Sequence, residues 1–132
     1  MPTRIHHVGV AVADLDESIR VYESALGAQL VHRATNEKEG LEAAFLRVGE
    51  GEIELMAALR DDSPVGKFMA KRGPGLHHVA YAVTDIDQAL ADARTSGLKL
   101  IDSEPRIGMH GTRIAFLHPK SVGGVLTELV EA

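Results

Sequence analysis

Two pairs of adjacent histidines are the residues most able to bind a metal ion. His6 and His7 open a valine-rich run, and His77 and His78 open a similar run 71 residues later. Neutral imidazole is a common metal ligand in proteins, and the chain has no cysteine to provide a thiolate. Any metal must therefore be held by nitrogen and oxygen ligands.

Two glutamates recur in the same manner. Glu54 and Glu128 each lie between apolar neighbours in runs typical of strands. An unpaired carboxylate in such a place is costly, and a bound cation would remove that cost. His7 and His78 together with Glu54 and Glu128 would supply one imidazole and one carboxylate from each half of the chain, which predicts a single metal site.

The matching positions reflect a duplication of the whole chain. Residues 5–16 are echoed by residues 76–87, and the later runs 53–56 and 127–130 also correspond. Each copy is expected to fold as a strand, a helix and three strands. We therefore expect an α+β fold in which two tandem βαβββ modules form one cupped mixed sheet around the metal site. The expected domain is 1–132, with module one at about 1–60, a linker helix at about 63–73 and module two at about 75–132.

Capping residues mark the expected helices. Asp14 stands before a helical stripe that begins at Leu15 and ends at Gly27, and Asp85 stands before a second stripe that ends at Gly97. A short linking helix is expected over 64–72. The remaining strands are expected at 29–34, 42–48, 52–56, 98–104, 112–117 and 125–131.

Alternation along the first strand separates the histidines. Residues 8, 10 and 12 share one face, whereas His7 shares the other with the small residues Gly9 and Ala11. The second copy divides in the same way, so His78 faces a space lined by small side chains, as a ligand pocket requires. The alternation sends His6 and His77 to the opposite face.

Composition limits the classes of function. A formal net charge of −5 and scattered basic residues argue against a nucleic-acid surface. No apolar run is long enough for a membrane span and the N-terminus lacks a secretory signal profile, so a cytoplasmic protein with no membrane partner is expected. A small-molecule substrate fits this chain best.

Longer segments resemble one family. They are Asp61–Phe68, Arg106–Gly111, Phe116–Lys120 and Gly124–Leu129. Together with the repeated His-His-Val strands, they are similar to the methylmalonyl-CoA epimerases, and the similarity covers essentially the entire chain. Those enzymes belong to the vicinal oxygen chelate superfamily, which also contains glyoxalase I, extradiol dioxygenases and antibiotic-resistance proteins.

The resemblance implies a metal-dependent isomerase that interconverts the R and S forms of methylmalonyl-CoA through an enolate. Its metal ligands would be His7, His78, Glu54 and Glu128, with Co²⁺ favoured and Mn²⁺, Ni²⁺ or Zn²⁺ as alternatives. Such an enzyme would be a homodimer. Glu54 or Glu128 would also carry a proton to or from the substrate, by analogy with glyoxalase I.

One acid/base position departs from the family pattern. Some epimerases have a glutamate where this chain has Ala43, and Glu42 lies one residue earlier. A shift of one residue turns a strand side chain to the other face, so Glu42 can serve as an acid/base only if a bulge re-aims it.

Basic residues near the expected pocket are candidates for binding coenzyme A. They are Arg113, His118 and Lys120. Two other functions stay open at this point. One is a glyoxalase-type metal-dependent isomerase or lyase on the same fold, and the other is a non-catalytic binding protein of the resistance type.

Overall fold

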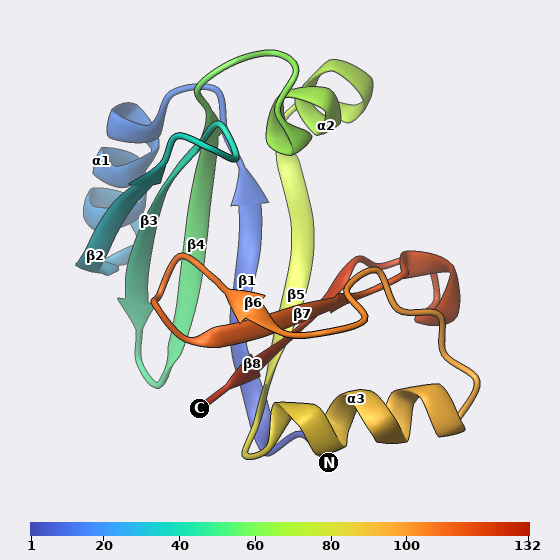
Figure 1. Cartoon of the computed structure of the whole chain (residues 1–132). Helices are drawn as coiled ribbons and strands as arrows, with labels where there is room; N and C mark the ends of the chain where they lie inside the picture. Colours follow the sequence, from blue (N-terminus) through green and yellow to red (C-terminus); the bar gives the residue numbers. More distant parts are fainter. The chain divides into compact units, whose positions relative to one another are not determined.

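Each half of the chain has the predicted order of one strand, one helix and three strands. The computed structural model describes residues 1–132 and has an α+β fold, as expected (Figure 1). In chain order the elements are β1 (Arg4–Ala11), α1 (Leu15–Leu26), β2 (Gln29–Asn36), β3 (Leu41–Val48), β4 (Gly51–Ala58), α2 (Pro64–Arg72), β5 (Gly75–Val83), α3 (Ile86–Thr95), β6 (Arg106–Ile107), β7 (Arg113–Leu117), the 3₁₀ turn η1 (Pro119–Ser121) and β8 (Thr127–Glu131).

The chain forms two units that do not coincide with the two repeats. The first unit consists of Met1–His7 and His78–Ala132, and the second of Val8–His77. Their boundaries fall inside β1 and β5, so each of these strands contributes residues to both units. The single domain with modules at 1–60 and 75–132 stays a prediction.

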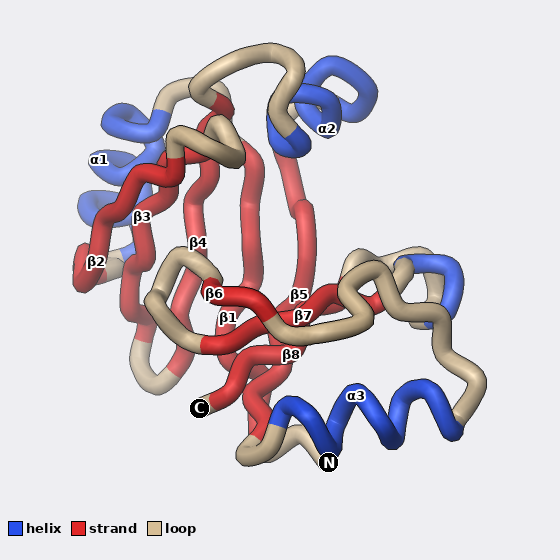
Figure 2. The backbone as a smooth tube through the Cα atoms, viewed as in Figure 1, coloured by secondary structure: helices blue, strands red, loops and turns tan.

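In the second unit, helix α1 covers one face of the strands. The strand order is β2-β3-β4-β1, and the pairs β2/β3 and β3/β4 are antiparallel. Figure 2 shows α1 beside β2 and β3. Leu15 and Ile19 of α1 pack with Ala44 and Leu46 of β3 and Leu55 of β4. Val10 and Val12 join this cluster, as the alternation along the first strand predicts. Gly9 and Ala11 therefore lie on the opposite strand face.

In the first unit, helix α3 packs on the strands β7 and β8. The strand order is β1-β5-β8-β7-β6, with β5 and β8 parallel and β7 and β8 antiparallel. Ile86 and Leu90 of α3 pack with Val83, Leu117 and Leu129 on one strand face. A smaller cluster of Ala80, Ile114, Phe116 and Val130 covers the other face.

The expected caps position the helices. Asp14 accepts a hydrogen bond from the backbone N–H of Glu17 at 3.0 Å, and Asp85 accepts one from that of Gln88 at 3.1 Å. Gly27 ends α1 in the left-handed conformation, with φ 65°. None of the three helices is long and apolar enough to cross a membrane.

The prediction of a strand at 98–104 is wrong. Leu100 makes only an isolated bridge to Leu117, and the backbone N–H groups of Ile101 and Asp102 both bond to the carbonyl of Phe116. The Asp102 carboxylate accepts the N–H of Phe116 at 2.8 Å, which replaces a ladder bond. The second strand of this copy is instead the two-residue β6 (Arg106–Ile107).

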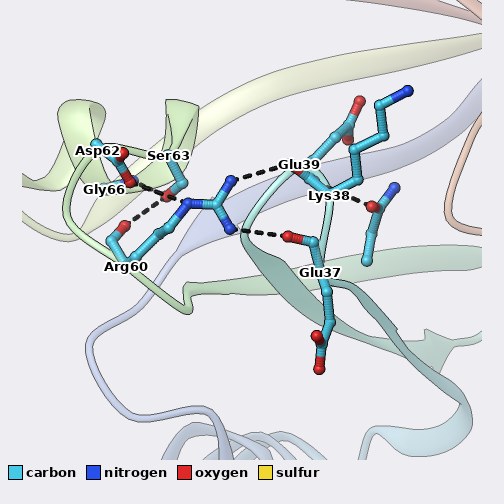
Figure 3. Close-up of polar contacts among 8 residues, drawn as sticks. Glu37, Lys38, Glu39, Arg60, Asp62, Ser63 and Gly66 are labelled. Carbon is cyan, nitrogen blue, oxygen red and sulfur yellow. Dashed lines mark hydrogen bonds and ion pairs between the residues drawn. The ribbon is translucent and has the colours of Figure 1, made fainter.

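An arginine holds the loop that precedes α2. The Arg60 guanidinium donates hydrogen bonds to the carbonyls of Glu37 and Lys38 at 2.8 and 2.9 Å, and its Nε lies 3.0 Å from a carboxylate oxygen of Asp62 (Figure 3). Ser63 caps α2 by accepting the N–H of Gly66 at 3.0 Å. The β2–β3 turn and the start of α2 are thereby tied together within the second unit.

We expect Gly66→Ala to destabilise the protein by about 2 kcal/mol, although alanine favours a helix more than glycine does. A Cβ atom at this position would lie 2.5 Å from the carbonyl oxygen of Arg60 and 2.6 Å from that of Asp61. These are backbone atoms, so the loop itself would have to move. Chemical unfolding followed by circular dichroism would measure the change, with Lys67→Ala, on the exposed side of α2, as the control. Equal stability of Gly66→Ala and wild type would contradict the tight packing.

Candidate metal centre

Two of the predicted ligands are buried histidines that face each other. His7 and His78 are each 3 % exposed, and both belong to the first unit. Their Nε2 atoms lie 3.1 Å apart and their rings meet edge to face. The imidazole nitrogens of β1 and β5 therefore point to a common position.

Glu128 brings a carboxylate to the same position. It lies on β8, which pairs with β5 in parallel so that Glu128 is opposite Ala80. Its Oε1 atom is 3.0 Å from Nε2 of His78 and 3.4 Å from Nε2 of His7. The small side chain of Ala80 leaves this side of the sheet open to the glutamate, as the sequence pattern predicted.

The two histidines change the acidity of this glutamate. Burial by itself raises the pKa of Glu128, but hydrogen bonds and charge interactions with His7 and His78 outweigh it and lower the pKa from 4.5 to about 2. The carboxylate is therefore ionised at neutral pH, which is the form that binds a cation.

The lowered pKa predicts a pH-dependent stability. Because the folded pKa of Glu128 is below its unfolded value, its contribution is fully present above about pH 4.5 and is lost as the pH falls toward about 2. In metal-free protein above pH 4.5, the free energy of unfolding of wild type is expected to exceed that of Glu128→Gln by on the order of 3 kcal/mol. Urea unfolding of both proteins across this range would measure the difference. A difference that does not shrink below pH 4.5 would contradict the shift.

The separations of the three ligand atoms match those around a metal ion. Bonds of about 2.0–2.2 Å from a divalent cation to nitrogen and oxygen place neighbouring ligand atoms about 3.0–3.5 Å apart. The observed separations of 3.0, 3.1 and 3.4 Å fall within this range. Three buried ligand atoms of the kind that divalent cations prefer thus form a cluster compatible with a divalent metal site.

Glu54 lies on β4 in the second unit. It is 4 % exposed and faces away from the α1 cluster, since its neighbours Ile53 and Leu55 belong to that cluster. Its partner across the β3/β4 pair is Phe45. The sequence predicted a carboxylate between apolar neighbours in a strand at this position, and the structure shows that it is buried.

The condition that would make Glu42 an acid/base is not met. The β3/β4 register runs without a bulge, pairing Glu42 with Ala57 and Ala43 with Met56. Glu42 therefore shares the α1 face with Ala57, and its carboxylate lies 3.6 Å from the guanidinium of Arg33. Strand alternation places Ala43, and not Glu42, on the face of Glu54.

Two predicted substrate contacts make hydrogen bonds within the first unit. The Arg113 guanidinium lies 2.7 Å from Asp87 and 3.2 Å from Glu131. His118 caps the turn η1 by accepting the N–H of Lys120 through its Nδ1 atom at 3.1 Å. The side chain of Lys120 is exposed. A role of these three residues in substrate binding stays a prediction.

The sequence patterns did not identify two rings beside the ligand histidines. Phe116, opposite Glu128 across β7/β8, packs its ring edge to face with His78, with centroids 5.6 Å apart. His6, which alternation placed on the other face, lies with its Nδ1 atom 2.8 Å from Nδ1 of His7. The pairing of Phe116 with Glu128 depends on strand register, which no local pattern predicts.

The chain matches a family model and proteins of known structure. Residues 6–116 match the model of the Glyoxalase/Bleomycin resistance protein/Dioxygenase superfamily. The crystal structure of methylmalonyl-CoA epimerase from Mycobacterium tuberculosis is 44% identical, with a TM-score of 0.93, and the match covers 98% of this chain and 87% of that one. A methylmalonyl-CoA epimerase in complex with methylmalonyl-CoA and NH₄⁺ is 42% identical, with a TM-score of 0.94 and coverage of 98% and 94%. The mitochondrial methylmalonyl-CoA epimerase of Homo sapiens is 36% identical over 98% of this chain and 74% of its own length.

The matches agree with the fold. Coverage of nearly the whole chain means that both copies of the βαβββ module are included. The chain therefore belongs to the Glyoxalase/Bleomycin resistance protein/Dioxygenase superfamily and, within it, to the family of the methylmalonyl-CoA epimerases.

Proposed function

We propose that this protein interconverts the R and S forms of methylmalonyl-CoA at C2, with a divalent cation held by His7, Glu54, His78 and Glu128. The strongest support is the convergence of two buried imidazole nitrogens and one buried carboxylate within 3.4 Å. This cluster lies in a chain that is 42% identical to an epimerase whose structure contains methylmalonyl-CoA.

Glu54 is the proposed fourth ligand because of its place in the duplication. It occupies in the first copy the position that Glu128 occupies in the second. Like Glu128 it is buried on the strand face opposite a helix. A carboxylate oxygen is a common ligand of divalent cations, so Glu54 offers the same kind of ligand atom as Glu128.

The reaction requires removal and return of one proton. The C2 carbon lies between a thioester and a carboxylate, and loss of its proton gives an enolate that can be reprotonated from either side. A bound divalent cation supplies electrostatic stabilisation of the negative charge that develops on the substrate oxygens. Inversion then needs one protein group to accept the proton and a second to donate one to the opposite face.

Glu54 and Glu128 are the proposed proton carriers. Both are buried carboxylates, and the repeat relates their positions, which suits a reaction that uses opposite faces of one carbon. Glu42 is not included because it lies on the α1 face with Arg33. Each carrier would combine ligation with proton transfer.

Further parts of the proposal concern the ion, the acyl-CoA contacts and the assembly. Nitrogen and carboxylate ligands suit Co²⁺, Mn²⁺, Ni²⁺ and Zn²⁺, and the family resemblance favours Co²⁺. Lys120, exposed next to the His118 cap, is the best placed of the basic candidates to meet a phosphate of coenzyme A. Twofold association is the commonest arrangement of soluble oligomers, and a homodimer is proposed on that basis.

Exchange of the C2 proton in deuterated water tests the proposal. Proton NMR would follow methylmalonyl-CoA with metal-stripped protein and with protein reloaded with Co²⁺. We expect stripping to reduce exchange by at least about 10³-fold and Co²⁺ to restore it. Absence of exchange with every divalent ion, together with turnover of a glutathione hemithioacetal, would contradict the epimerase proposal and would support a glyoxalase-type isomerase.

A further inference from the structure

His6 makes a contact that strand alternation does not explain. It precedes the ligand His7 on β1, so its side chain is expected on the opposite face. Its Nδ1 atom nevertheless lies 2.8 Å from Nδ1 of His7, and the two rings meet at 77° with centroids 5.1 Å apart. In such a contact one nitrogen donates and the other accepts, so it fixes the position of a proton.

The geometry of the cluster decides which nitrogen donates. Nε2 of His7 points to Nε2 of His78 and to the carboxylate of Glu128, so Nε2 is the atom available to a cation. A ligand nitrogen must carry a lone pair, and neutral imidazole then has its proton on Nδ1. With a cation on Nε2, His7 therefore donates from Nδ1, and Nδ1 of His6 accepts.

The ring of His6 is supported on another side. His110, in the loop between β6 and β7, lies edge to face with His6 at a centroid distance of 5.6 Å. His6 itself is partly buried. A loop residue therefore contacts the acceptor ring, which restricts its rotation.

The second copy of the repeat differs at the matching position. His77 precedes the ligand His78 as His6 precedes His7, but its ring packs against Phe68 of α2, with centroids 4.8 Å apart. Phe116 lies against the ring of His78. The two halves thus use different neighbours beside equivalent ligands.

We propose that His6 is a positioning residue that accepts the Nδ1 proton of His7 and thereby holds the His7 tautomer with Nε2 free for a divalent cation. Ligand histidines commonly donate their second nitrogen to a carboxylate, carbonyl or water, and loss of that partner typically costs 10- to 100-fold in metal affinity. Here the partner is another imidazole. This inference rests on the proposed metal site.

The wild-type protein tests the tautomers directly. With selectively ¹⁵N-labelled histidine and Zn²⁺ as a diamagnetic probe, NMR is expected to show a protonated Nδ1 and a metal-bound Nε2 in His7, and a protonated Nε2 in His6. A protonated Nδ1 in His6 would overturn the proposal. Absence of Zn²⁺ binding by wild type would instead mean that the proposed metal site is wrong.

Matched variants test the effect on affinity. His6→Phe keeps an aromatic ring but removes the acceptor, and is expected to raise the Kd for Zn²⁺ by 10- to 100-fold in calorimetry. His6→Asn, whose side-chain oxygen can accept from the same direction, is expected to restore the Kd to within about threefold of wild type. His77→Phe is the control at the matching position. Equal Kd values for His6→Phe and His77→Phe would refute the inference, and the wild-type spectrum decides it if a variant fails to fold.

Discussion

Replacing Glu128 with glutamine is expected to lower the rate of methylmalonyl-CoA epimerisation by about 10³-fold at saturating cation, while C2 proton exchange persists in one of the two epimers. An amide cannot accept the proton that the Glu128 carboxylate would take. The second carrier, Glu54, would still remove the proton that faces it. NMR in deuterated water, started separately from each epimer, would measure both rates.

The complementary variant makes this prediction specific. Glu54→Gln is expected to retain exchange in the opposite epimer, because the two carriers would act on opposite faces of C2. Glu131→Gln is the matched control on β8, where Glu131 accepts the N–H of Ile86 and pairs with Arg113. Loss of exchange from the same epimer in both variants would contradict the two-carboxylate mechanism. Metal content must be measured in each variant because both residues are also proposed ligands.

Replacing His78 with alanine is expected to raise the Kd for Co²⁺ by more than about 10²-fold. Loss of a direct ligand costs more than loss of an outer hydrogen-bond partner, which alone costs 10- to 100-fold. The residue is 3 % exposed and its Nε2 atom is 3.0 Å from Glu128, so the variant also removes a hydrogen-bond partner of the carboxylate. Calorimetric titration of metal-stripped protein would give the Kd.

Added imidazole provides a second readout for this variant. A free imidazole that enters the vacated space can replace the lost nitrogen, and partial recovery of Co²⁺ binding is expected. His32→Ala, on the exposed strand β2, is the control for loss of a histidine. An unchanged Kd in His78→Ala would exclude His78 as a ligand.

Local patterns predicted the helices well because capping is a short-range effect. Asp14 and Asp85 accept hydrogen bonds from residues three positions later, and Gly27 has the left-handed backbone that ends α1. The linking helix at 64–72 has the expected bounds because Ser63, Pro64 and Gly73 act within one turn. Such features depend on neighbours in the chain and are visible in sequence.

The strand at 98–104 was predicted wrongly because its pairing is not local. An apolar run there favours a strand, but the Asp102 carboxylate takes the N–H of Phe116 and only an isolated bridge forms at Leu100. That hydrogen bond joins residues 14 positions apart. Propensity alone cannot anticipate a side chain that replaces a ladder bond.

The sequence by itself determined the duplicated βαβββ order and the burial of His7, His78, Glu54 and Glu128, because side-chain alternation and the apolar neighbours are local properties. Only the tertiary structure decided which atoms meet. The parallel pairing of β5 with β8 brings Glu128 to within 3.0 Å of His78 across 50 residues of chain. The unbroken β3/β4 register placed Glu42 on the α1 face. Nδ1 of His6 lies 2.8 Å from Nδ1 of His7 although alternation assigns the two side chains to opposite faces. Register and side-chain rotation are set by packing between distant segments, and no local pattern records them.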